Sequence, residues 1–358
     1  MPSEPLKNLL AERIRAEGPL RLDTYMQEAL ANPDHGYYTT RNAIGAKGDF
    51  TTAPEISQLF GELVGLWIVD CWHQMGAPEA INIVEPGPGR GTLMADAVRA
   101  ILQVSTMDPA IHLIEVSPRL VALQKERINA TWHESLDTVP PGPFILVGNE
   151  FFDALPIRQF EKVQEGWAEV AVGINTANQS LQRHLAPCPT PALVAGPENV
   201  ETAPIGSMVE ICPAAESIMA DISARLAQHG GAALFLDYGY AEPAFGGSLQ
   251  ALYQGQYADP FEKPGQADLT AHVNFSALAN IAKGAGLTSF GPTTQSQFLD
   301  RLGLPIRAAS LKKNATADQA RDIDLAVHRL MAPDQMGELF KVLAVAPSGS
   351  VQPAGFAA

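Results

Sequence analysis

The segment Ile81 to Leu93, which reads INIVEPGPGRGTL, constrains the fold more than any other part of the chain. A short apolar run ends in an acid, Glu85, and is followed by a glycine-rich loop and then by an apolar-periodic segment. This order predicts a strand, a tight turn and a helix, the ligand-binding corner of an α/β sheet. Glycine suits such a turn because it adopts unusual φ and ψ angles and has no Cβ to keep a ligand away. The glycines of the loop are Gly87, Gly89 and Gly91.

The acid Glu85 indicates which ligand the turn binds. In a dinucleotide site a pyrophosphate lies against this loop and the N-terminus of the next helix, and a carboxylate beside it would repel the phosphate. S-adenosylmethionine (SAM) instead carries an ammonium and a sulfonium, which a carboxylate attracts. The dinucleotide pattern GxGxxG would also require a small residue at the position of Thr92. We therefore predict SAM as the cofactor; an NAD-dependent oxidoreductase and a ligand-free glycine turn are the alternatives.

Apolar strands separated by helical segments predict a Rossmann-like α/β fold with a mostly parallel sheet. Ligands bind such sheets at the carboxyl ends of the strands. Polar residues follow four of the apolar strands at this edge, which is a stronger signal than any of them alone. These residues are Glu85, Glu115, Asn149 and Asp237. The expected strands include 81–85, 111–116, a short 128–132, 144–148, 232–237 and 340–345.

The chain is expected to divide into three parts. Residues 1–78 would form an N-terminal helical cap with an active-site loop, and residues 79–347 the Rossmann-like core. The core would carry an insertion at about 158–206, rich in Pro, Ala and Asn, and an accessory region at about 240–335. The tail 348–358 has the composition of a disordered segment.

Composition narrows the class of protein and its partners. The net charge of −15 disfavours a nucleic-acid partner, since phosphates require clustered Lys and Arg. No apolar run approaches the roughly 20 residues that span a bilayer, so no membrane insertion is expected. The three cysteines form no CxxC pair, which argues against a disulfide framework or a metal site and favours the cytoplasm. The N-terminus resembles neither a secretory signal nor a transit peptide.

Two further segments supply candidate chemistry. Glu115 could accept hydrogen bonds from both ribose hydroxyls of an adenosine, and Ser135 could reach the adenine. In GNEFFDALP, residues 148–156, we assign Asn149, Glu150 and Asp153 to the place where a methyl group is presented. Carboxylates suit a guanidinium nucleophile because they hold its planar donor fork bidentately. Asp153 could instead be a turn or cap residue.

A polar loop before the sheet could close over a bound ligand. Its candidate residues are Asp49, Thr51, Ser57 and Gln58. Helix capping by Thr51 or Thr52 is an equal explanation, and a single helix is expected over about 55–75. Tyr238 could wall the site and His272 could act as a base, although an isolated histidine is more often structural.

Six motifs carry a resemblance to a known family. They are HGYY (35–38), GDFTTAPEISQLFGE (48–62), EPGPGRGTL, NEFFDALP, LDYGY and DLTAHVNF. Occurring in this order from about residue 20 to about 345, they resemble the MidA-like family of SAM-dependent methyltransferases. Eukaryotic members of that family are mitochondrial assembly factors for respiratory complex I.

The resemblance implies a class I methyltransferase fold and methylation of a protein partner, yielding symmetric dimethylarginine on a core complex I subunit. Glu85 and the loop glycines would bind the donor, and Asn149, Glu150 and Asp153 would lie near the acceptor. Asn274 departs from the DLTAHVDF-type pattern, so no essential charge is expected there. A non-catalytic assembly chaperone that binds SAM is the alternative; the mitochondrial address does not carry over, and the oligomeric state is open.

Overall fold

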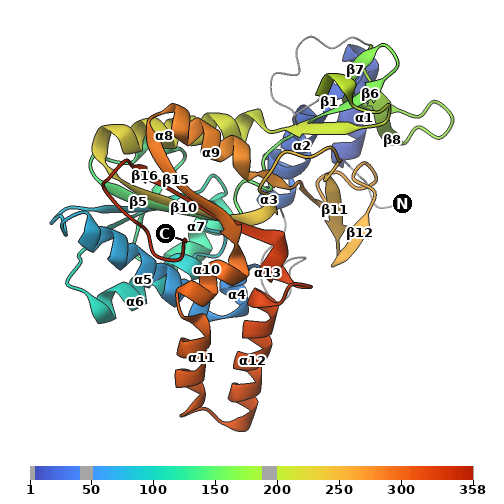
Figure 1. Cartoon of the computed structure of the whole chain (residues 1–358). Helices are drawn as coiled ribbons and strands as arrows, with labels where there is room; N and C mark the ends of the chain where they lie inside the picture. Colours follow the sequence, from blue (N-terminus) through green and yellow to red (C-terminus); the bar gives the residue numbers. More distant parts are fainter. Residues whose placement is uncertain (1–4, 41–50, 188–199, 358) are drawn as a thin grey trace.

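The computed structural model describes residues 5–40, 51–187 and 200–357. Its centre is an eight-stranded sheet of order β15-β16-β10-β5-β2-β3-β4, with β14 paired to β10 off this path (Figure 1). The strands from β10 to β4 run parallel, and β16 pairs antiparallel with both β10 and β15. The mostly parallel α/β sheet predicted from the sequence is confirmed. The strands are β2 (Asn82–Pro86), β3 (Ala110–Ile114), β4 (Thr131–His133), β5 (Phe144–Asn149), β10 (Gly231–Tyr240), β14 (Val273–Asn274), β15 (Leu287–Thr294) and β16 (Phe340–Pro347).

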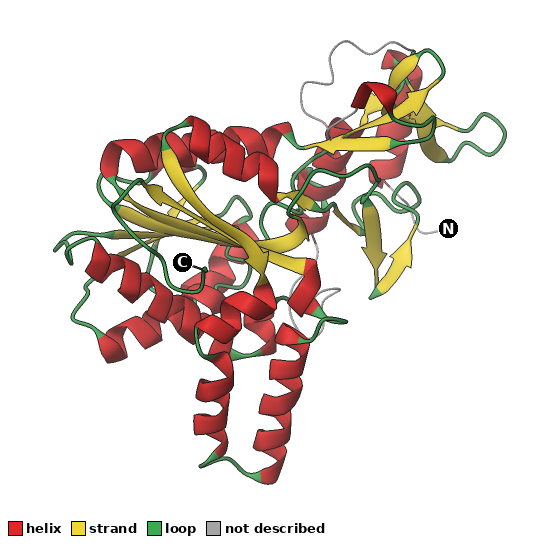
Figure 2. Cartoon of the chain, viewed as in Figure 1, coloured by secondary structure: helices red, strands yellow, loops and turns green. Residues whose placement is uncertain are grey.

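Helices cover both faces of this sheet (Figure 2), because the central strands are apolar on both sides. Along β5, Ile145 and Val147 share one core with α5 and α6, whereas Phe144 and Leu146 share another with α8 and α9. Within the described ranges, no helix combines the length and apolarity needed to cross a membrane. The flanking helices are α5 (Gln58–Gln74), α6 (Thr92–Val104), α7 (Pro118–Lys125), α8 (Pro213–His229) and α9 (Phe275–Gly284).

The helix expected over 55–75 is interrupted at its start. A short α4 (Ala53–Ile56) precedes α5, and Ser57 between them is extended, with φ −160° and ψ 136°. The Ser57 hydroxyl accepts a hydrogen bond from the Leu59 N–H at 3.2 Å, which caps α5. The interruption lets α4 turn away from the α5 axis.

A second lobe combines segments that are far apart in the sequence. It joins the first helices to a five-stranded sheet of order β1-β7-β6-β9 with β8 paired to β7, and to a three-stranded sheet β12-β11-β13. Tyr25 and Met26 share its core with Val172 and Leu181. The structure thus divides the predicted cap 1–78 between two bodies, since α5 belongs to the central sheet. The lobe contains α1 (Pro5–Glu17), β1 (Leu20–Arg21), α2 (Leu22–Ala31), α3 (Tyr37–Thr40), β6 (Arg158–Val163), β7 (Gly166–Ile174), β8 (Leu181–Leu185), β9 (Met208–Ile211), β11 (Gln250–Tyr253), β12 (Gln256–Ala258) and β13 (Asp268–Thr270).

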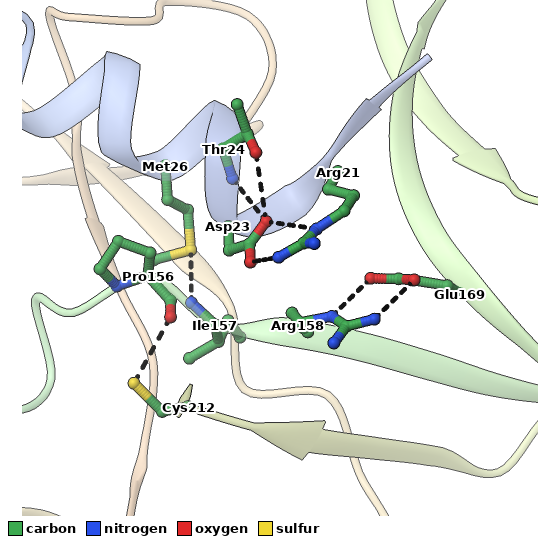
Figure 3. A network of polar contacts seen from close by, with 9 residues as sticks. All are labelled: Arg21, Asp23, Thr24, Met26, Pro156, Ile157, Arg158, Glu169 and Cys212. Atoms are coloured by element: carbon green, nitrogen blue, oxygen red, sulfur yellow. Dashed lines mark hydrogen bonds and ion pairs between the residues drawn. The ribbon is translucent and has the colours of Figure 1, made fainter. Parts of the chain in front are cut away.

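Polar contacts join parts of this lobe to one another where the chain enters it after the central sheet (Figure 3). The Arg158 guanidinium binds the Glu169 carboxylate through two hydrogen bonds of 2.7 and 2.9 Å between β6 and β7. The Ile157 N–H lies 3.5 Å from the Met26 sulfur on α2. The lobe is therefore attached directly after the predicted acceptor motif, which ends at Pro156.

The C-terminal part adds four helices and an ordered tail. Helices α11 and α12 pack side by side and project away from the sheet (Figure 1). The disorder predicted for 348–358 is wrong for the described residues: Val351 is buried, and the Phe356 ring lies 5.4 Å from that of Phe298. Two apolar anchors hold a segment that otherwise consists mostly of small residues. The helices are α10 (Gln295–Arg301), α11 (Leu304–Lys312), α12 (Ala317–Met331) and α13 (Met336–Leu339).

Candidate active site

The glycine turn between β2 and α6 has the geometry expected from the sequence. Gly87, Gly89 and Gly91 have φ values of 61°, 53° and 76°, in the left-handed region that glycine tolerates best. A Cβ at Gly87 would lie 3.0 Å from the Phe151 ring. The turn therefore packs closely against the predicted acceptor segment, and Gly91 leads directly into α6.

An open cleft of about 390 Å³ lies over this turn. It brings together three segments that are distant in the sequence: the region of α4, the glycine turn and the end of β5. Five of the predicted site residues line it, namely Glu85, Gly87, Gly89, Asn149 and Glu150. The other lining residues are Thr52, Pro54, Glu55, Pro88, Arg90, Thr92 and Leu93.

Two oxygen atoms of the cleft residues have no hydrogen-bond donor in the described part of the chain. Glu85 Oε2 and Asn149 Oδ1 are buried and have no partner among the described residues. Burial raises the pKa of Glu85 to about 8, and a backbone hydrogen bond from Met94 opposes the rise. Buried acceptors without donors are costly, so a ligand that brings an ammonium group would satisfy both atoms and favour the ionised carboxylate. The amino acid end of SAM carries such a group.

Glu115 lies one residue beyond β3, at the same edge of the sheet. Its two carboxylate oxygens accept hydrogen bonds from the Ser117 N–H at 2.8 Å and from the Gln124 amide at 3.2 Å. Burial raises the pKa of Glu115, and these hydrogen bonds oppose the rise. Ser135 is exposed after β4, just before a short 3-10 helix (Leu136–Thr138). Neither residue lines the cleft, and their contacts with a nucleoside stay predictions.

The acceptor segment is held by an acid that the sequence analysis placed only at a strand end. Asp237 on β10 accepts the N–H groups of residues 151, 152 and 153 on one carboxylate oxygen, at 3.1, 3.0 and 3.2 Å. Its other oxygen accepts the Tyr238 N–H at 2.9 Å. Glu150, directly before this turn, has φ 49°, a conformation rarely adopted by residues other than glycine. Asp237 therefore fixes the turn that carries Glu150 and Asp153.

Three acids at this turn lie close enough to disturb one another. Burial raises the pKa of Glu150 to about 7, and the neighbouring Asp153 adds to the shift. Burial also raises the pKa of Asp153, and the pKa of Asp237 rises well above its ordinary value through burial and then through repulsion by Asp153 and Glu150. The region disfavours negative charge and would bind a cation.

Helix α4 connects the two sides of the cleft. The Ala53 N–H donates to Glu150 Oε1 at 3.0 Å, and the Asn149 amide donates to the same oxygen at 3.0 Å. On the other side, Glu55 forms an ion pair with Arg90 at 3.4 Å and accepts a hydrogen bond from the Thr92 hydroxyl. The sequence analysis missed Glu55 and Arg90, although Glu55 stands inside one of the family motifs.

The remaining predicted residues lie elsewhere. Ser57 caps α5, and the exposed Gln58 amide donates to Glu62 at 3.4 Å. The backbone carbonyl of the half-buried Thr51 accepts a hydrogen bond from the Arg329 guanidinium at 3.5 Å. None of these three residues lines the cleft, and Asp49 lies outside the described residues.

His272 lines a separate cavity of about 530 Å³ beside α8 and α9, together with Glu210. Its ring meets that of Tyr238 edge-on at 5.6 Å, and burial lowers its pKa. Glu210 accepts hydrogen bonds from the Gln159 amide at 2.6 Å and from the N–H of Ser248 at 2.8 Å. Its role is to hold the lobe together.

The mostly parallel sheet, the glycine turn and the cleft, whose two acceptor oxygens are unpaired within the described ranges, define a class I SAM-dependent methyltransferase. A crystal structure of a protein from Burkholderia thailandensis bound to S-adenosyl-homocysteine has a TM-score of 0.82 and 28% sequence identity, covering 98% of this chain and 93% of that one. The chain belongs to the MidA-like family, whose model is described as "Putative S-adenosyl-L-methionine-dependent methyltransferase" and matches residues 63–293. The predicted family, enzyme class and cofactor are confirmed.

Curated relatives match over nearly the whole chain. The protein arginine methyltransferase NDUFAF7, mitochondrial, of Rattus norvegicus is 38% identical over 376 residues, covering 96% of this chain and 84% of the relative. The Homo sapiens protein of the same name is 36% identical over 382 residues, covering 98% of this chain and 85% of the relative.

Proposed function

We propose that this enzyme methylates an arginine side chain of a protein partner. The observation that supports the proposal is the group of three acids at the acceptor turn, Glu150, Asp153 and Asp237, whose pKa values are all raised. Glu150 lines the cleft that holds the cofactor in this proposal, and a guanidinium would relieve the repulsion among the acids. The names of the curated relatives agree with an arginine acceptor.

The chemistry assigned to the residues is a direct displacement. Bound SAM supplies an electrophilic methyl carbon attached to a sulfonium, and the guanidinium nitrogen forms the new bond to that carbon as the bond to sulfur breaks. Glu150 and Asp153 hold the planar guanidinium and aim its nitrogen. The nitrogen loses one proton, and Glu150 receives it. The raised pKa of about 7 suits Glu150 to this transfer near neutral pH.

The finer proposal concerns the product and the partner. From the family resemblance, we propose symmetric dimethylarginine on a core subunit of respiratory complex I. Asn149, Glu150, Asp153 and Tyr238 would lie on the acceptor side, and Glu85, Glu115, Ser135 and the loop glycines on the donor side. The cytoplasm stays a prediction from the sequence.

Transfer of labelled methyl groups from SAM to a cell lysate tests the proposal. We expect label on arginine of one or a few proteins, and mass spectrometry of the labelled peptide distinguishes symmetric from asymmetric dimethylation. A Gly89→Val variant should lose label because valine disfavours the φ of 53° that Gly89 adopts in the turn lining the cleft. Label on another residue type would overturn the arginine acceptor.

The two alternative functions, a SAM-binding chaperone and an NAD-dependent oxidoreductase, predict different results with the same purified protein and lysate. If the protein is a SAM-binding chaperone, calorimetry would detect SAM binding, but no arginine in the lysate would become methylated when the protein is added. An NAD-dependent oxidoreductase would release heat with NAD and none with SAM. The S-adenosyl-homocysteine in the Burkholderia thailandensis relative favours SAM over NAD.

A further inference from the structure

A fully buried glutamine connects the separate parts of the donor side. Gln124 lies on α7 and is 0% exposed. Its amide nitrogen donates to the Gly89 carbonyl at 2.8 Å and to the Glu115 carboxylate at 3.2 Å, and its amide oxygen accepts the Trp132 indole N–H at 2.8 Å. A Cβ at Gly91 would lie 3.4 Å from the Gln124 side chain. One side chain thus contacts the glycine turn, the end of β3 and β4.

We propose that Gln124 is a positioning residue for the nucleoside of the donor, holding the glycine turn and Glu115 in the arrangement that receives it. The inference rests on SAM binding in the cleft and on the proposed contact of Glu115 with the ribose hydroxyls. Gln124 does not itself line the cleft, and its contact with the cleft lining is the hydrogen bond to the Gly89 carbonyl. It acts on the donor through its neighbours.

The chemistry of the amide fits this position. A primary amide offers two N–H donors and a carbonyl acceptor, and Gln124 uses the donors for two acceptors and the carbonyl for one donor. A glutamate would place a second carboxylate beside Glu115 and the Gly89 carbonyl. A leucine would leave all three partners unsatisfied inside the protein. Gln124 also turns one Glu115 oxygen toward itself, while the Ser117 N–H holds the other oxygen.

A second buried glutamine provides a matched control. Gln295 on α10 is also 0% exposed, and its amide nitrogen donates to the Leu330 carbonyl at 2.9 Å. Gln295 does not line the cleft. Replacing it by leucine removes one buried hydrogen bond, to the Leu330 carbonyl, and should lower stability without changing donor binding.

The test measures ligand binding by calorimetry on the full chain. Gln124→Leu should bind SAM about tenfold more weakly than the wild type, as expected for a lost hydrogen bond to a charged group. Gln295→Leu should keep the wild-type affinity. The turnover number at saturating SAM should be unchanged in Gln124→Leu, because the acceptor turn is held separately by Asp237. Equal SAM affinity in Gln124→Leu and the wild type would overturn the inference.

A ligand series separates positioning from a general loss of structure. The probes are 5′-methylthioadenosine and its 2′,3′-dideoxy analogue. Removing the hydroxyls should weaken binding to the wild type about tenfold and weaken binding to Gln124→Leu much less, since Glu115 is already misplaced. An equal loss in both proteins would show that Gln124 is merely structural.

The outcomes distinguish a failure of the cofactor assignment from a failure of the inference about Gln124. If the wild type does not bind SAM, the cofactor assignment itself is wrong. If the wild type binds SAM but binds the two nucleosides with equal affinity, the role of Glu115 and this inference are both overturned. If Gln124→Leu does not fold, Trp132→Phe replaces it. That variant removes only the donor to the Gln124 carbonyl, so it should weaken the hydroxyl-dependent part of binding by a few-fold; no change would overturn the inference.

Discussion

The two sides of the cleft are built by different means. On the donor side the backbone itself forms the site, through three glycines at positive φ between β2 and α6. On the acceptor side a turn of ordinary residues is held by the carboxylate of Asp237, which comes from another strand. The donor side is polar with one strongly shifted acid, Glu85, whereas the acceptor side gathers three acids. Donor binding and acceptor activation can therefore be damaged separately.

The largest effect is expected from Glu150→Gln. The amide keeps the size of the side chain but cannot receive the proton, so the turnover number should fall about a thousandfold while SAM binding is retained. Label transfer and calorimetry measure the two quantities. Glu165→Gln, in the exposed turn between β6 and β7, should leave both unchanged. Loss of SAM binding in Glu150→Gln would show that the two sides are not separable.

The second-largest effect is expected from Asp237→Ala. It leaves the N–H groups of residues 151 to 153 without their acceptor, and we expect a loss of about 3 kcal/mol in the free energy of unfolding together with a drop in turnover. Chemical denaturation and label transfer measure these effects. Asp237→Asn keeps an acceptor oxygen and should be milder on both scales. A fully active and stable Asp237→Ala would refute the anchoring role.

The third prediction concerns the pH dependence of stability on the donor side. The pKa of Glu85 rises from 4.5 to about 8 in the folded protein, so the folded state holds this proton more tightly than the unfolded state. The resulting stabilisation is complete below pH 4.5 and is lost as the pH rises through about 8, at about 1.4 kcal/mol per pH unit between these values.

Between pH 5.5 and 7, the contribution of Glu85 should therefore fall by about 2 kcal/mol, and Glu85→Gln should remove this part of the slope. Saturating SAM should remove it as well, because its ammonium favours the ionised carboxylate. Denaturation curves at several pH values measure the slope. Identical slopes in the wild type and in Glu85→Gln would contradict the burial of an unpaired acid.

The smallest effect is expected from Ser57→Ala, at the junction of α4 and α5. Loss of the cap should cost about 1 kcal/mol of stability and leave SAM affinity unchanged. Thermal unfolding and calorimetry measure both. If Ser57→Ala bound SAM more weakly without losing stability, Ser57 would be a ligand contact, as predicted from the sequence.

The donor side could be predicted because its information is local. Glu85, the glycines and the start of α6 lie within 13 consecutive residues, from Ile81 to Leu93, and need no knowledge of the rest of the fold. Strand ends at Glu115 and Asn149 followed from apolar runs and were nearly correct. The short strand expected over 128–132 is found at Thr131–His133, because Ile128 and Ala130 pack against the core from irregular backbone before the strand.

The rest depended on contacts between distant residues. The hydrogen bonds that Asp237 accepts span 84 to 86 positions, so its anchoring role had no local signal. The break at Ser57 follows from the contacts of α4 with both Glu150 and the glycine turn. Residues 351–356 pack on the core through Val351 and Phe356, which a composition argument cannot detect.

The shared core of the second lobe has a consequence for synthesis. The stripe of α1, with Leu6 and Leu10, packs in the same core as Val172 of β7 and Leu269 of β13. During translation α1 leaves the ribosome long before its partners, and at about 5–20 residues per second the wait for β7 lasts roughly 8 to 30 seconds. Through that interval the nascent chain displays an unprotected apolar surface, a natural point for chaperone attachment, while the lobe closes only after most of the catalytic domain has been made.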